Sequence, residues 1–147
     1  MHDILKKPTK HLVSSLIFPE IQKELIANPS LVGSLQGLLV IIVLKNSVEQ
    51  DEWFVLLRQG QPPKITTTKP ENIDGLKVGI VRLEDRTVMK FISGGLTGVN
   101  ALANGKIKVA GDLEFINELG NVFYAAGGVE KTTAYLKAAL KINKAKL

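Results

Sequence analysis

Few residues in this chain combine the types and the spacing that catalysis or metal binding requires. The chain contains no cysteine, which excludes disulfides, cysteine zinc sites, iron–sulfur ligation and thiol catalysis. Its two histidines, His2 and His11, both lie near the N-terminus, and neither has the sequence context of a metal ligand or of a Ser-His-Asp triad. We therefore expect no metal site, no cofactor and no catalytic residue.

Two acidic groups and one glycine-rich stretch are the remaining candidates for chemistry. Glu49, Asp51 and Glu52 fall in an expected polar turn, where solvation explains them better than paired acid–base catalysis. The stretch 84–86 (Glu-Asp-Arg) follows an expected strand, where Asp85 can cap the next helix. The stretch 93–98 (Ser-Gly-Gly-Leu-Thr-Gly) follows a helix and lacks the Gly-Lys-[Ser/Thr] ending of a phosphate-binding loop. These patterns predict a protein that is not an enzyme.

Positive charge is concentrated at the two ends of the chain. The net charge is +5: residues 129–147 carry +4, residues 1–10 carry +2, and the residues between them carry −1. A basic end is typical of transient contact with anionic membrane surfaces, although a lysine-rich solvated helix face has the same composition. Arginine is scarce, and the aromatic residues fall within apolar runs rather than between basic residues. We therefore expect no nucleic-acid partner.

Length and composition predict one domain with a real core. The chain has 147 residues, of which 45% are hydrophobic and 22% are charged, values typical of a globular domain. The longest strictly apolar run, Leu38 to Leu44, has seven residues, far fewer than the roughly 20 that a membrane-spanning helix needs. The N-terminus also lacks the pattern of a secretory signal. We expect a soluble intracellular protein.

The hydrophobic pattern predicts an α+β fold, with about five strands in a mostly antiparallel sheet and about five helices that cover it. The first strand, 38–44, is rich in β-branched residues, and the second is its expected hairpin partner. The expected strands span residues 38–44, 52–58, 64–68, 76–83 and 106–110. A polar turn over 45–51 is expected to join the first two, and the short polar strand 64–68 is expected at a sheet edge. The expected helices are a unit over 12–26 that Pro19 divides into two segments, and helices over 85–92, 97–103, 112–126 and 129–144. Asp112 is expected to cap the helix over 112–126.

The order of these segments is similar to that of a known family. Residues 105–112 (Gly-Lys-Ile-Lys-Val-Ala-Gly-Asp), followed by an apolar helix, resemble the signature of the sterol carrier protein type 2 domain. Upstream, a strand over 76–83 leads into Glu-Asp, a helix with Phe91 and Ile92, and then Gly-Gly-Leu at 94–96, as in that family. The resemblance covers residues 31–126 and is strongest over 76–119.

The resemblance implies a hydrophobic tunnel between the sheet and the helices. Family members are carriers that bind sterols, phospholipids, fatty acids and fatty acyl-CoA. Some hold a carboxylate near an arginine-containing loop before the first strand. Here residues 28–36 contain no Arg or Lys, which favours a neutral ligand or a head group left at the solvent mouth. By position, the lipid-binding residues would be Trp53, Val88, Met89, Phe91, Ile92, Leu102, Ile107, Phe115, Ile116, Leu119, Phe123, Leu136 and Leu140.

The ends of the chain complete this prediction. Residues 1–30 would be an N-terminal helical extension and residues 129–147 a lid helix and tail, within a single lipid-binding domain over 1–147. The last three residues, Ala145, Lys146 and Leu147, resemble the peroxisomal address Ser-Lys-Leu, which an import receptor reads. They predict a peroxisomal protein if the source is eukaryotic, and a cytoplasmic one otherwise.

Two functions remain open from the sequence. The first is a non-catalytic intracellular lipid carrier, whose apolar tunnel holds a sterol, fatty acid, fatty acyl-CoA or phospholipid. The second is an accessory or regulatory domain of a larger lipid-metabolising system, which acts by protein contact and holds no exchangeable ligand. Apolar stripes alone favour neither, because they also form ordinary cores.

Overall fold

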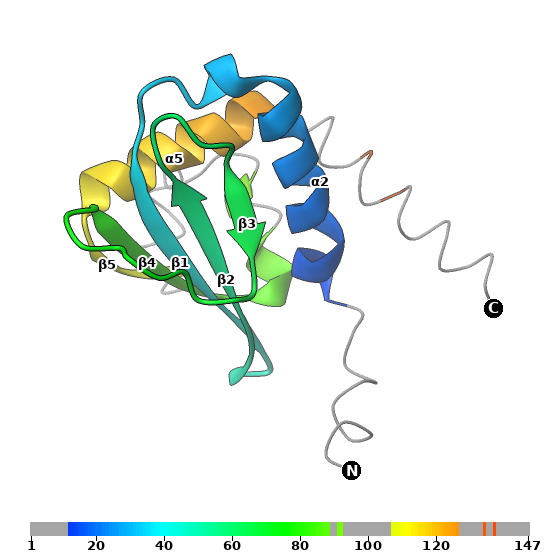
Figure 1. Ribbon diagram of the computed structural model, residues 1–147. Coiled ribbons are helices and arrows are strands. Elements are labelled where there is room, and N and C mark those ends of the chain that lie inside the picture. The colour runs from blue at the N-terminus through cyan, green and yellow to red at the C-terminus, as the bar shows by residue number, and fades with distance from the viewer. Residues whose placement is uncertain (1–11, 89–90, 93–106, 127–133, 135–136, 138–147) are drawn as a thin grey trace, which may run out of the picture.

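The computed structural model describes residues 12–88, 91–92, 107–126, 134 and 137. They form a five-stranded sheet with two α-helices packed on one face (Figure 1). In chain order the elements are α2 (Val13–Ala27), the 3-10 helix η2 (Pro29–Leu31), β1 (Gly37–Lys45), β2 (Val48–Leu57), β3 (Lys64–Thr66), β4 (Val78–Glu84), the 3-10 helix η3 (Asp85–Thr87), β5 (Ile107–Gly111) and α5 (Leu113–Ala126).

The sheet is mixed rather than mostly antiparallel. Its strand order is β3-β2-β1-β4-β5. Strand β1 pairs antiparallel with β2 but parallel with β4, and the two edge pairings are antiparallel. The central parallel pair arises because the chain passes from edge strand β3 across β2 and β1 before it enters β4. The prediction of five strands is confirmed, and so is the placement of β3 at an edge.

The β1–β2 hairpin turns through two residues, not through the longer polar turn expected over 45–51. Asn46 and Ser47 have φ angles of 54° and 67°, the left-handed conformation that matches the twist of paired strands. Their backbone N–H groups donate to the carboxylate of Glu84 at 3.0 and 2.8 Å. The polar residues that suggested a turn therefore belong to β2, which begins at Val48.

Helix α2 is continuous through Pro19, where the sequence predicts a break. Proline in a helix interior removes one hydrogen bond and costs about 3 kcal/mol. Here Phe18, Ile21 and Leu25 on both sides of Pro19 are fully buried in the core, and burial of one such side chain contributes about 1.5–3 kcal/mol. Tertiary packing therefore keeps the two predicted segments in one helix.

Among the described residues, α2 and α5 are the α-helices whose bounds the structure defines. Val88, Phe91 and Ile92, within the expected helix 85–92, are also helical, and so are residues 134 and 137 within the expected helix 129–144. The expected helix 97–103 and most of 129–144 lie outside the described residues. Asp85 begins the 3-10 helix η3 but does not cap it through its side chain, contrary to expectation. No helix among the described residues has the length and apolarity to cross a lipid bilayer.

The core lies between the sheet and the two helices. Across the sheet, Trp53, Ile41, Val81 and Val109 are paired in one row, so their side chains share one face. That face meets α2 where Phe18 packs on Trp53, with ring centroids 5.1 Å apart. The opposite face is crossed by residues 67–77, which Arg58 holds through the carbonyls of Glu71 and Asn72.

Candidate functional site

The lipid-binding residues predicted from the sequence come together wherever the structure describes them. They belong to one continuous apolar cluster between the sheet and α5, and the most exposed of them, Trp53, is only 8% exposed. Phe91 packs edge-on against Phe123, with centroids 5.8 Å apart. The residues of this group are Trp53, Val88, Phe91, Ile92, Ile107, Phe115, Ile116, Leu119 and Phe123. We call this cluster, together with the α2 residues described next, the apolar interior.

Helix α2 contributes residues that the predicted site omitted. Ile17, Phe18, Ile21 and Leu25 are fully buried and belong to the same cluster. Their spacing places them on one face of a helix, so the sequence contained the signal. These residues were not predicted to bind lipid because the family resemblance begins only at residue 31.

The other predicted site residues lie outside the described residues. This holds for the lipid-binding candidates Met89, Leu102, Leu136 and Leu140 and for the targeting residues Ala145, Lys146 and Leu147. Their predicted roles stay predictions.

Among the described residues, two buried side-chain atoms at or beside the apolar interior have no hydrogen-bond partner. They are Oγ of Ser14, which is fully buried, and Nε1 of Trp53. A buried donor without a partner costs about 1–3 kcal/mol, so native structures contain few of them. Both atoms could bond an oxygen atom of a molecule held in the interior. The indole N–H can only donate, whereas the serine hydroxyl can donate or accept.

The N-terminus of α2 is held by a carboxylate from a distant part of the chain. Asp85 is 8% exposed, and its two oxygens accept the N–H groups of Val13 at 2.6 Å and Ser14 at 3.0 Å. These donors have no partner within the helix. Asp85 is therefore a structural cap for α2 and is not placed as a catalytic acid or base.

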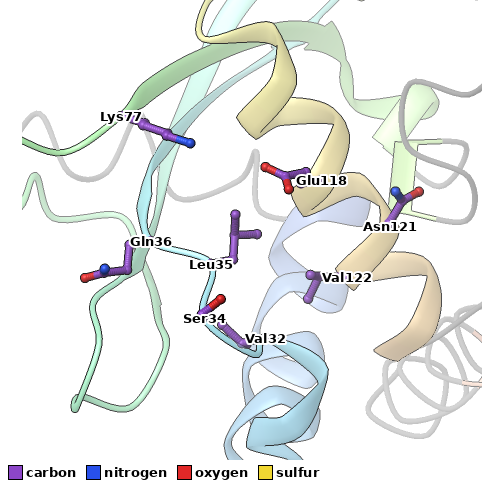
Figure 2. Close-up of a pocket in the computed structure, with 8 residues that line it drawn as sticks. All are labelled: Val32, Ser34, Leu35, Gln36, Lys77, Glu118, Asn121 and Val122. Carbon is purple, nitrogen blue, oxygen red and sulfur yellow. The ribbon is translucent and has the colours of Figure 1, made fainter.

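A pocket of about 530 Å³ opens beside the apolar interior, between the segment before β1, the start of β4 and α5. Its floor contains Val32, Leu35 and Val122, and Lys77 and Glu118 stand at its rim (Figure 2). The remaining lining residues are Ser34, Gln36 and Asn121. None of the predicted lipid-binding residues that the structure describes lines this pocket. The sequence alone does not reveal this pocket, because Lys77 and Glu118 are far apart in the chain and come together only in the folded structure.

The acidic residues of β2 lie at or near the surface of the sheet. Glu49 is exposed and pairs with Arg82 on β4, and Glu52 is also exposed. Within the described part of the chain, no group of His, Asp and Glu is placed to hold a metal ion. The expectation that these carboxylates are solvated is confirmed for Glu49 and Glu52, whereas Asp51 is half-buried.

Comparison with known proteins identifies the fold. No family model and no curated protein sequence matches the chain. Among solved structures, sterol carrier protein 2 from Yarrowia lipolytica in its apo form matches with a TM-score of 0.62 at 15% identity, over 80% of this chain and 94% of that one. Sterol carrier protein 2 from Aedes aegypti in complex with palmitate matches with a TM-score of 0.58 at 21% identity, over 78% and 96%.

A third similar structure belongs to a biosynthetic system. UbiJ-SCP2, described as a ubiquinone synthesis protein, matches with a TM-score of 0.54 at 15% identity, over 82% of this chain and 93% of that one. The class of protein is thus an α+β domain with an apolar interior between a sheet and helices. More particularly, the chain has the sterol carrier protein 2 fold, as its resemblance to that family predicts.

Proposed function

We propose that this protein is a non-catalytic lipid carrier whose apolar interior receives the hydrocarbon part of a sterol, fatty acid, fatty acyl-CoA or phospholipid. The observation that carries the proposal is the gathering of the predicted lining residues into one interior within a sterol carrier protein 2 fold. Each buried CH₂ of a lipid contributes about 0.8 kcal/mol to binding. A long chain can therefore bind there without a strong head-group contact.

The unpaired polar atoms of the interior support the same proposal. Nε1 of Trp53 and Oγ of Ser14 are buried without a partner in the part of the chain that the structure describes, and a lipid ester, carboxyl or hydroxyl oxygen would supply one. A ligand oxygen bonded to these atoms would remove the cost of burying them without a partner. Lipids that carry an oxygen beside a long apolar chain fit this arrangement better than plain hydrocarbons.

The test is denaturing extraction of the purified protein, followed by mass spectrometry of the released lipid. The proposal predicts about one lipid molecule per protein chain, the stoichiometry of a single buried site. Trp53 is the only tryptophan, so its fluorescence should shift when delipidated protein is titrated with that lipid. An empty extract together with an unchanged Trp53 spectrum would contradict the carrier function.

A matched pair of variants locates the binding site. Leu119 is fully buried on α5, whereas Tyr124 on the same helix is 57% exposed. Leu119→Trp should fill the interior and lower the bound lipid per folded protein, and Tyr124→Trp should leave it unchanged. Circular dichroism of both variants separates lipid loss from unfolding. Equal lipid content in the two folded variants would place the ligand elsewhere.

The second candidate is an accessory domain that acts by protein contact. Its support is the similarity to UbiJ-SCP2, a ubiquinone synthesis protein, and the close packing of α5 on the sheet, where Ile116 lies against Gly79. This function predicts an empty interior. The extraction experiment therefore distinguishes the two candidates directly.

A further inference from the structure

The pocket beside the apolar interior joins apolar and charged surfaces in one place. Val32 and Leu35 on its floor pack against the core, and Val122 is part of it. Lys77 and Glu118 at the rim are both exposed. A ligand with an apolar body and a polar head can therefore place its head in this pocket while its chain continues over the floor toward the interior.

The two charges at the rim have opposite signs and no charged partner. Figure 2 shows their side chains pointing toward each other above Leu35, one from the residue before β4 and the other from α5. Neither forms an ion pair with any residue in the described part of the chain. Gln36 is occupied, because its side-chain oxygen accepts the N–H of Gln59 at 3.1 Å. The pocket thus offers one free ammonium and one free carboxylate.

We propose that this pocket binds the zwitterionic head group of a membrane phospholipid, with the phosphate next to Lys77 and the ammonium next to Glu118. The proposal rests on the proposed carrier function and specifies its ligand class. Each end of such a head group meets an opposite charge, so both contacts are attractive.

Other lipid classes use this pair of charges less well. A fatty-acid carboxylate is attracted by Lys77 but repelled by Glu118, so the two contributions offset each other. An anionic phospholipid has the same disadvantage. A sterol hydroxyl uses neither charge. The pair therefore distinguishes zwitterionic from anionic lipids by attraction and repulsion together, as selective sites generally do.

The experiment measures lipid retained by the delipidated full chain after incubation with vesicles of phosphatidylcholine or phosphatidylglycerol with matched acyl chains, or with palmitate. The wild type should prefer phosphatidylcholine. Glu118→Gln should reduce that preference about fivefold, the size expected for an exposed charge contact, and should increase retention of palmitate. Lys77→Gln should weaken retention of all three lipids, since each carries a negative charge.

Matched controls separate the pocket from general charge effects. Glu114 lies on the same helix as Glu118, and Lys64 lies on edge strand β3; both are exposed and neither lines the pocket. Glu114→Gln and Lys64→Gln should leave the lipid preference unchanged. The double variant Lys77→Glu/Glu118→Lys should recover the phosphatidylcholine preference that each single charge reversal abolishes, because a flexible head group can bind in the reversed orientation.

The outcomes distinguish this inference from the carrier function. Retention of all lipids without preference, or a Glu118→Gln variant with an unchanged preference, overturns the head-group site and leaves the carrier function standing. No retention of any lipid overturns both. A parallel titration with soluble glycerophosphocholine identifies the source of the head group, because binding as strong as that of the intact lipid would overturn a membrane-lipid ligand.

Discussion

The two α-helices of the described structure begin in different ways. At the start of α5, Asp112 accepts the N–H of Phe115 at 2.9 Å, three residues further along the chain. At the start of α2, the N-cap residue is Leu12, whose side chain makes no cap hydrogen bond. Asp85 instead accepts the N–H groups of Val13 and Ser14. Both helix starts are capped by a carboxylate, but one carboxylate is local and the other is distant.

This difference shows that the two helices depend on the fold to different degrees. Helix α5 carries its own cap, so its first turn is stabilised as soon as the segment is helical. Helix α2 obtains its cap only when β4 and η3 are in place. Removing the distant cap should therefore cost more than removing the local one, because it leaves two N–H groups without a partner in a largely buried place.

Asp85→Ala should produce the largest effect, a loss of about 3 kcal/mol in the free energy of unfolding, because two charge-assisted hydrogen bonds are lost and their donors stay buried. Urea unfolding monitored by Trp53 fluorescence measures it. Asp74→Ala is the matched control, since Asp74 is exposed in the segment before β4 and should change little. A loss below about 1 kcal/mol, the value of an ordinary N-cap, would remove the proposed difference between the helices.

Gly79→Ala tests the second contribution to the position of α5, its packing against β4. A Cβ atom at this position would lie 2.4 Å from Cγ1 of Ile116, so the helix must move away from β4. Overpacking of this kind costs about 1–3 kcal/mol. In an Ile116→Ala background the same substitution should cost close to nothing. An equal cost in both backgrounds would show that Ile116 is not the contact that matters.

Asp112→Ala should cost about 1 kcal/mol, the usual value for loss of an N-cap side chain. Asp112→Ser should retain most of the wild-type stability, because a serine oxygen can accept the same N–H group. Thermal or urea unfolding of the two variants provides the comparison. If Asp112→Ala costs as much as Asp85→Ala, then a local cap and a distant cap are equivalent here.

Ser14→Ala should produce the smallest effect and the opposite sign. The substitution keeps the backbone N–H that Asp85 accepts and removes a buried hydroxyl without a partner. It should raise the free energy of unfolding by up to about 1 kcal/mol in delipidated protein. Ser15→Ala supplies the control, because Ser15 is only partly buried and reports helix propensity alone. Equal gains in the two variants would mean that the buried hydroxyl costs nothing.

The features that could be predicted from the sequence are those set by neighbouring residues. A run of β-branched residues, its expected hairpin partner and two alternating segments predicted four of the strands, and the short polar strand at Lys64 was correctly placed at an edge. Asp112 was correctly predicted to cap the helix that extends to Ala126. Helical spacing correctly predicted the buried residues Ile116, Leu119 and Phe123, whereas Leu113, on the same predicted stripe, is 55% exposed.

The features that could not be predicted depend on residues far apart in the chain. The parallel pairing of β1 with β4 requires a crossover that no local pattern specifies. Pro19 was predicted to break the helix, because the burial of the residues on both sides of it is set only when the core is assembled. Asp85 was predicted to cap the helix that follows it, because only the folded structure brings Val13 beside its carboxylate. The Lys77–Glu118 pocket combines residues from two elements for the same reason.

The distant cap also bears on the order of events in folding. Asp85 is 72 residues from Val13 and 71 from Ser14 along the chain, and closing so long a loop is entropically costly before other contacts support it. The first turn of α2 should thus become native after the transition state, once β4 has joined the sheet. Asp85→Ala should then accelerate unfolding strongly and change the refolding rate little. A refolding rate that falls in proportion to the lost stability would instead place the start of α2 in the folding nucleus.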